Sequence, residues 1–293
     1  MQEKSFRPYI VADIEGTSGV WKREDTMAGT PGWCRARVEM THDVSAAVDT
    51  LFSCGASSVM VKDFHRDGFN IVPRLLDRRA VLVSGYYLKP LVMYGNLRRS
   101  NRAFFIGMHA ASGNRNGFLS HTLTSRITRL SINGNDVCET QIFAHVLGEV
   151  RVPVVFVSGC PEACREAREH LPWIVTCPVP KVGSYQAMTD YASLVRDHLR
   201  ETIAEAAALK NPQLYRLIPP YEVKITFRDE KTAMRSRWNY PIEGSTVRFH
   251  AEYSEDLIFS LIRIAYFSPL TWSLLPWLLP PVQWLRGIGD RLF

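Results

Sequence analysis

The stretch Tyr9-Ile-Val-Ala-Asp-Ile-Glu-Gly16 combines a short apolar run with two carboxylates and a glycine. A run of this length that is apolar throughout is typical of a strand buried on both faces, as in a parallel sheet. Residues two apart in an extended chain project to the same side, so Asp13 and Glu15 would place their carboxylates together. Because crowded carboxylates repel each other unless a cation or a proton separates them, the end of this strand is a candidate cation site.

Three further apolar runs have the same character, at residues 58–61, 103–108 and 152–157. Helical patterns lie between or after them, at residues 41–54, 161–171 and 191–210. This alternation of strands and helices predicts an α/β fold in which helices cover a mostly parallel sheet.

The sequence changes in character after residue 218. Tyr221–Phe227 and Thr246–Ala251 alternate with a period of two, as strands with one wet face do, and a helical pattern follows at residues 254–267. We therefore expect an α/β metal-binding domain over residues 1–218 and a smaller α+β C-terminal lobe over residues 219–267. The remaining residues, 268–293, form an apolar tail rich in Trp and Pro.

The composition excludes some classes of protein. The 293-residue chain has 35 basic and 29 acidic residues, a net charge of +6, and these charges are scattered along it, so we expect no nucleic-acid partner. The six cysteines contain no CxxC pair, which argues against a structural zinc ribbon. Met1–Arg7 holds no apolar run of signal-peptide length, so we expect reduced thiols in a cytoplasmic protein.

Residue types that bind metals follow three of the predicted strands. Asp13 and Glu15 follow the first, Asp63 and His65 the second, and His109 the third. Ligands of an open α/β sheet bind beyond the carboxyl ends of its strands, where these residues would meet. Mixed oxygen and nitrogen ligands suit zinc, manganese or iron better than calcium.

Two more residues of this kind come later in the chain. His121 follows Phe118-Leu-Ser, and Glu139 opens an apparent helix beyond the hairpin dipeptide Asn133-Gly134. Each candidate also has a purely structural interpretation. A histidine at a strand end is most often a hydrogen-bonded structural residue. Glu139 would interact favourably with the helix dipole, and Asp13 would cap a turn. Spacing alone supports these interpretations and a metal site about equally.

Five motifs occur in a fixed order. They are Ala12-Asp-Ile-Glu-Gly-Thr-Ser-Gly19, Lys62-Asp-Phe-His65 with Asn70, Ile106-Gly-Met-His109-Ala, Phe118-Leu-Ser-His121, and Ile132-Asn-Gly with Glu139. Together, over residues 8–267, they resemble the dinuclear zinc D-aminopeptidases of the dipeptide-transport-operon (DppA) type. The resemblance implies an α/β domain with a smaller lobe, and assembly into a ring-shaped homo-oligomer.

The resemblance also implies two Zn²⁺ ions per chain. Asp13 would bridge the ions, Glu15 and His109 would complete one of them, and His65 and Glu139 would complete the other. Two metals bridged by a carboxylate lower the pKa of a shared water from about 16 towards neutrality, so hydroxide becomes available.

His121 matches the family's catalytic histidine. Such a residue can assist proton transfer to the leaving amine or attack the carbonyl itself, and both roles stay open. The chain departs from the family at Gly159-Cys160, where the family carries Gly-Asp, and at Gly183–Gln186, where it carries an arginine. A thiol nucleophile at Cys160 is the less favoured interpretation, because no histidine adjoins it in sequence.

We therefore expect a zinc-dependent, aminopeptidase-like hydrolase that cleaves amide bonds of short peptides. Whether its substrate has a free amino terminus or a D-residue stays open. The alternatives are a metal-dependent amidase for another acylated amino compound and a non-catalytic peptide-binding scaffold that retains the metals.

The apolar tail needs a cover. Its aromatic residues and inner prolines are Trp272, Trp277, Trp284, Pro276, Pro280 and Pro281. The prolines are expected to break any long helix and to interrupt a transmembrane span. Since so much exposed apolar surface is a liability, we expect the tail to be covered by the protein's own lobe or by a neighbouring subunit, and of these we favour the subunit. Peripheral membrane contact is the less favoured alternative.

Overall fold

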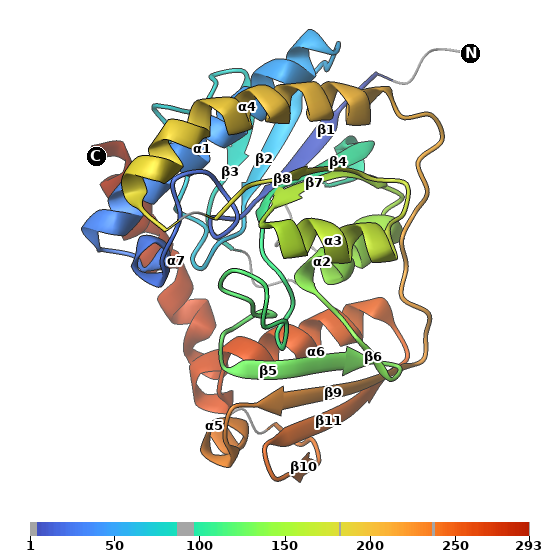
Figure 1. Cartoon of the computed structure of the whole chain (residues 1–293). Helices are drawn as coiled ribbons and strands as arrows, with labels where there is room; N and C mark the ends of the chain where they lie inside the picture. The colour runs from blue at the N-terminus through green and yellow to red at the C-terminus, as the bar shows by residue number, and fades with distance from the viewer. Residues whose placement is uncertain (1–4, 87–96, 182, 236–237, 293) are drawn as a thin grey trace.

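The computed structural model describes residues 5–86, 97–181, 183–235 and 238–292, which form two sheets and the helices around them (Figure 1). The larger sheet has six parallel strands in the order β3-β2-β1-β4-β7-β8. Their bounds are Pro8–Ala12 for β1, Val59–Asp63 for β2, Ala80–Val83 for β3, Arg102–Met108 for β4, Val154–Gly159 for β7 and Val175–Pro178 for β8. The predicted parallel α/β sheet is confirmed.

Helices cover both faces of this sheet (Figure 1). On one face lie α1 and α4, and on the other lie α2 and α3; their bounds are Pro31–Ser53 for α1, Glu139–Glu149 for α2, Pro161–His170 for α3 and Tyr185–Ala208 for α4. Ile10 packs with the α1 and α4 side chains, whereas its neighbours Tyr9 and Val11 pack with those of α2 and α3. Every residue of β1 is consequently buried, which explains its unbroken apolar run.

Helix α1 begins ten residues before the predicted start. Thr30 caps it by accepting a hydrogen bond from the Trp33 N–H at 3.0 Å, and Pro31 occupies the first turn. A capping threonine followed by proline is a helix-start signal that the apolar spacing did not include. Helix α4 likewise begins six residues early, behind the cap residue Ser184.

The smaller sheet is antiparallel, with the order β10-β11-β9-β5-β6. Its strands are β5 (Ile127–Ile132), β6 (Asn135–Asp136), β9 (Tyr221–Phe227), β10 (Ile242–Glu243) and β11 (Thr246–Ala251), and its helices are α5 (Glu230–Arg235) and α6 (Ser254–Tyr266). The hairpin β5–β6 belongs to the smaller sheet because β5 pairs with β9. Its residues nevertheless lie within the range 1–218 that we assigned to the larger domain. A division at residue 218 therefore does not separate the two sheets.

The tail does not behave as its prolines suggested. Residues Pro269–Leu292 form one helix, α7, which runs from the smaller lobe along the flank of the molecule towards the larger sheet (Figure 1). Pro276, Pro280 and Pro281 all lie inside this helix and are exposed, so their rings meet solvent rather than packed side chains. The expectation that these prolines break a long helix was wrong.

Two short 3-10 helices, η1 (Arg23–Thr26) and η3 (Leu97–Arg99), complete the described elements. No single helix within the described residues is long and apolar enough to span a membrane, and α6 with the part of α7 up to Arg286 passes that test only as a pair bent by 97°. All six cysteines lie in described segments and are free thiols.

A buried histidine in α2 makes the fold sensitive to acid. Burial lowers the pKa of His145 from 6.5 to about 4, and its Nδ1 accepts a hydrogen bond from the Leu217 N–H at 3.2 Å. Between these pH values the unfolded chain binds a proton that the folded chain does not, so the unfolding free energy falls as the pH falls. The loss is about 3 kcal/mol by pH 4, and the His145→Gln variant should be spared it.

Urea unfolding at pH 7 and pH 4.5, with wild type, His145→Gln and the exposed-site control His198→Gln, measures this contribution. The difference in unfolding free energy between wild type and His145→Gln should shrink or reverse at the lower pH. If the unfolding free energies of all three proteins changed with pH to the same extent, His145 would not be the source of the acid sensitivity.

Candidate metal centre

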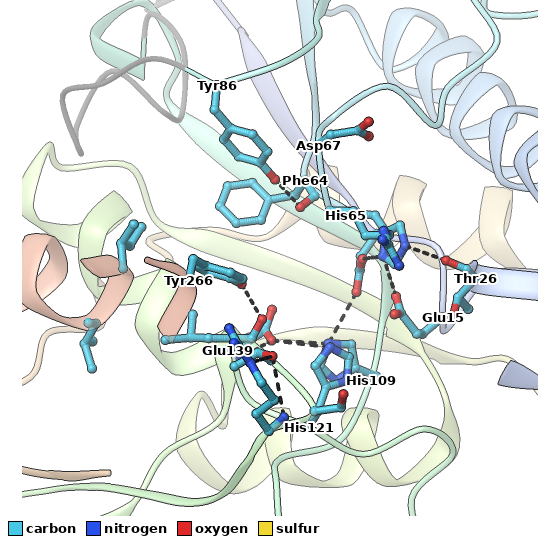
Figure 2. A pocket seen from close by; sticks show the side chains of 18 of the residues that line it. Glu15, Thr26, Phe64, His65, Asp67, Tyr86, His109, His121, Glu139 and Tyr266 are labelled. Atoms are coloured by element: carbon cyan, nitrogen blue, oxygen red, sulfur yellow. Dashed lines mark hydrogen bonds and ion pairs between the residues drawn. The ribbon is translucent and has the colours of Figure 1, made fainter. Parts of the chain in front are cut away.

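The carboxyl ends of three neighbouring strands form the floor of the site. β1 lies between β2 and β4, with Ala12 opposite Asp63 on one side and Ile106 on the other. Asp13 and Glu15 follow β1, His65 follows β2 and His109 follows β4. Glu15, His65 and His109 point towards one another in Figure 2, and Asp13 lies 3.3 Å from His65 Nδ1 and 3.5 Å from His109 Nε2. The strand-end residues that the sequence singled out are therefore brought together, with Asp63 as the exception.

Two glycines let the backbone of β1 turn against β4. A Cβ on Gly16 would lie 2.1 Å from the Met108 carbonyl oxygen, and one on Gly107 would lie 2.2 Å from the Asp13 carbonyl oxygen. Gly16 N–H donates to the Gly107 carbonyl at 2.8 Å across this contact. Only glycine allows so close an approach, which places Glu15 beside Asp13 over the end of β1.

Asp13, Glu15 and His65 form the first cluster. His65 Nδ1 lies 3.3 Å from Asp13 Oδ1 and 3.1 Å from Glu15 Oε2. Its other ring nitrogen, Nε2, lies 3.1 Å from the Thr26 carbonyl oxygen. A proton donated to that carbonyl leaves Nδ1 with a free lone pair facing the two carboxylates, as a metal ligand requires.

His109, Glu139 and His121 form the second cluster, on the other side of Asp13. His109 Nε2 lies 3.5 Å from Asp13 Oδ2 and 3.4 Å from Glu139 Oε1, while its Nδ1 faces the Ala110 carbonyl at 3.1 Å. His121 Nε2 lies 4.0 Å from Glu139 Oε1, and the two histidine rings stack at 3.8 Å. The two oxygens of Asp13 thus serve different clusters.

These contacts group the side chains differently from the predicted ligand sets. Glu15 lies with His65, and Glu139 lies with His109, whereas we expected Glu15 with His109 and His65 with Glu139. The reason is the strand order: His65 and His109 stand on opposite sides of β1, and α2, which carries Glu139, packs against β4. Which side of β1 Glu15 faces was invisible in the sequence.

Burial and crowding shift the pKa values of the groups in both clusters. Burial, together with the charge of Glu15, raises the pKa of Asp13 to about 7. Despite burial, which acts in the opposite direction, the carboxylates hold the pKa values of His65 and His109 well above the ordinary histidine value. Asp13 Oδ2 and Glu15 Oε2 are buried and accept no hydrogen bond from the residues that the structure describes. Carboxylate oxygens and imidazole nitrogens buried together fit zinc-type cations, which would displace the imidazole protons on binding.

Asp63 has a structural role. Its Oδ2 accepts hydrogen bonds from the N–H groups of Asn70 and Ile71, and the Asn70 amide also donates to the His65 carbonyl at 2.6 Å. Asp63 and Asn70 therefore fix the loop that carries His65. Cys160 is fully buried at the start of α3 and does not line the pocket described next, which agrees with the buried-thiol interpretation.

A single pocket of about 860 Å³ contains both clusters. Besides Phe64, Ile142 and Phe143 from the larger part of the fold, its lining includes apolar side chains from α6, α7 and the turn between them. We call this last group the apolar wall: Ile258, Phe259, Leu261, Ile262, Phe267, Trp272, Leu275 and Leu279. The sequence did not indicate that these side chains line the pocket. The apolar residues of the tail were the signal that could have pointed to such a surface.

A parallel α/β sheet that gathers two carboxylate–histidine clusters around one shared aspartate has the arrangement of a metal-dependent hydrolase. Comparison with known proteins narrows that class. A model of the D-aminopeptidase family, peptidase family M55, matches residues 6–261, and the chain belongs to this family.

A curated sequence and a solved structure, both from Bacillus subtilis, show how far the likeness extends. A D-aminopeptidase of strain 168 is 27% identical over 241 residues, which cover 82% of this chain and 87% of the relative. The solved structure of the zinc-dependent D-aminopeptidase DppA, described as a self-compartmentalizing protease, aligns with a TM-score of 0.79 at 26% identity. That alignment covers 88% of this chain and 96% of the solved one, so the expected family and fold are confirmed.

Proposed function

We propose that this protein is a zinc-dependent hydrolase that cleaves amide bonds of short peptides, in the manner of the D-aminopeptidases. The observation that carries the proposal is the shared aspartate: Asp13 Oδ1 faces the first cluster and Asp13 Oδ2 the second, inside one pocket. Membership of the D-aminopeptidase family and the zinc dependence of DppA support the same activity.

The five proposed ligands divide around Asp13. Glu15 and His65 would hold one ion with it, and His109 and Glu139 would hold the other. Bound there, two zinc ions supply an activated water and polarise the scissile carbonyl. The Leu123 N–H donates to Glu139 Oε1 at 2.6 Å and so orients that carboxylate.

His121 is the proposed proton carrier. Its Nδ1 lies 2.8 Å from the Leu119 carbonyl, so a proton held there leaves Nε2 unprotonated and turned towards the second cluster. Burial and the neighbouring His109 lower the pKa of His121 below the ordinary value. A neutral imidazole can accept a proton at pH 7 and pass it to the leaving amine.

Elemental analysis of protein purified without chelator, together with a panel of D- and L-aminoacyl amides with and without a free amine, tests the function. We expect about two zinc ions per chain and turnover of at least one free-amine substrate. Turnover confined to blocked amines would favour the amidase alternative. Metals without turnover of any compound would favour the peptide-binding scaffold, and absence of a transition metal would refute the metal site.

We further propose a cytoplasmic, ring-shaped homo-oligomer in which the outer face of α7 packs against a neighbouring subunit. The six free thiols suit a reducing compartment. The description of DppA as self-compartmentalizing supports assembly, and the outer side chains Trp277 and Trp284 of α7 are 80% and 67% exposed. Apolar surface of this kind is normally covered in a functional assembly.

Replacing both outer tryptophans by serine should lower the native mass measured by light scattering, because the subunit contact loses its largest apolar side chains. Tyr253→Ser, at an exposed aromatic residue outside α7, is the matched control. An unchanged mass for the double variant, with wild type alone sedimenting with anionic lipid vesicles, would instead support membrane contact.

A further inference from the structure

The apolar wall lies largely outside the part of the chain that defines the family. The family match ends at residue 261, whereas Ile262, Phe267 and the three α7 residues of the wall come after it. The metal-ligand clusters and the wall nevertheless line the same pocket. A molecule bound at the clusters is therefore within reach of a surface that family membership does not explain.

Helix α7 is attached to the body of the protein at both ends of the pocket. Near its start, the Trp272 ring packs edge-on against Phe259 at 5.0 Å and against Phe267 at 5.3 Å. Further along, the Gln283 side chain donates to the Tyr86 carbonyl at 2.5 Å, and Arg286 Nε lies 2.8 Å from Asp67 Oδ2. These contacts hold α7 across the pocket.

The second attachment reaches the metal-site loop itself. Asp67 is two residues beyond His65, and the Arg286 guanidinium also lies 5.7 Å from the Trp33 ring and 5.9 Å from the Phe69 ring. A Cβ on Gly85 would lie 2.4 Å from Gln283 Oε1, so the backbone there approaches α7 closely. Helix α7 is thus fitted against the strands and loops that carry the clusters.

The side chains of α7 separate into two faces. Trp272, Leu275, Leu279, Gln283 and Arg286 are half-buried, and their spacing of three and four residues places them on one side of a helix. Leu274 and Leu278, adjacent in sequence to wall residues, are 44% and 53% exposed on the other side. The α7 part of the wall is therefore one face of this helix. Its two leucines, Leu275 and Leu279, each follow an outward-facing leucine in the sequence.

We propose that the apolar wall is a specificity site for amide substrates that carry a bulky apolar group, such as an aromatic side chain or an alkyl chain, beside the scissile bond. The inference rests on the proposed hydrolase function and names its substrate class. A pocket of about 860 Å³ is far larger than a small aminoacyl amide, which would leave the wall in contact with water. An apolar group that displaces this water gains about fourfold in affinity for each methylene that becomes buried.

Two measurements on the full-length, metal-loaded protein test the proposal. In the first, KM is determined for the amides of alanine, leucine and phenylalanine in the reactive stereochemical series. We expect KM for phenylalanine amide to be at least tenfold lower than for alanine amide. Leu275→Trp fills the pocket and should raise KM for phenylalanine amide about tenfold while leaving alanine amide within about twofold.

Leu274→Trp is the matched control, because it adds the same side chain to the outer face and should leave both KM values unchanged. The pair Leu279→Trp and Leu278→Trp repeats the comparison one helical turn further along. A wild-type KM that does not depend on side-chain size, or equal effects of inner and outer tryptophans, would overturn the proposal.

The second measurement is calorimetric titration with N-hexylacetamide and N-methylacetamide, which requires no turnover. We expect the hexyl compound to bind at least tenfold more tightly, and Leu275→Trp to abolish this difference while Leu274→Trp keeps it. If no amide in any series is hydrolysed, the hydrolase function fails, and this titration alone decides whether the apolar site exists. Equal affinities of the two compounds for wild type would refute it.

Discussion

Replacing Asp13 by alanine is expected to remove both zinc ions and to lower kcat/KM by at least about a thousandfold. The physical reason is that the two oxygens of Asp13 face different clusters, at 3.3 Å from His65 Nδ1 and 3.5 Å from His109 Nε2. Without it, each cluster keeps only two of its proposed carboxylate and imidazole ligands, and the two sites lose their common bridge. Elemental analysis and steady-state kinetics measure the two effects together.

The matched control is Asp136→Ala, at an aspartate of β6 that is exposed and lies outside the pocket. It should retain both ions and full activity. Glu15→Ala and Glu139→Ala should each lose mainly one ion, since the two glutamates belong to different clusters. An Asp13→Ala protein that still holds two ions would show that Asp13 is not the bridge.

The second large effect is expected at His121. We predict that His121→Ala lowers kcat by about a hundredfold or more and leaves about two zinc ions bound, because a proton carrier is lost while the five ligands remain. The test separates two roles, because His121 Nε2 lies 4.0 Å from Glu139 Oε1 and the His121 ring stacks on the His109 ring. Its position alone would also suit a metal ligand.

His109→Ala is the comparison that separates the two roles. Its Nε2 faces both Asp13 and Glu139, so its loss should release metal as well as activity. If His121→Ala and His109→Ala lose metal to the same extent, His121 is a ligand and the proposed proton transfer needs another residue.

Whether the sequence could predict a site residue depends on whether that residue follows a buried strand. Asp13, Glu15, His65 and His109 could be found because each follows a buried strand, and parallel strands end at one edge of a sheet. His121 and Glu139 were candidates by residue type, but only the family motifs assigned them to the site. The reason is that a loop and a helix start, not strand ends, bring them to that edge. Asp63 shared the strand-end signal of His65, yet it bonds to the loop backbone instead.

The sequence by itself determined the parallel sheet, its helical cover and the residue types of the metal centre, because these follow from local periodicity and from short motifs. Only the tertiary structure decided which glutamate joins which histidine, since that depends on the order of strands in the sheet and on where α2 packs. It also decided that β5 and β6 join the smaller sheet, because pairing with β9 is a contact between segments far apart in the chain. The same holds for α7: its composition shows an apolar helix face, but only packing places that face in the pocket of the metal centre.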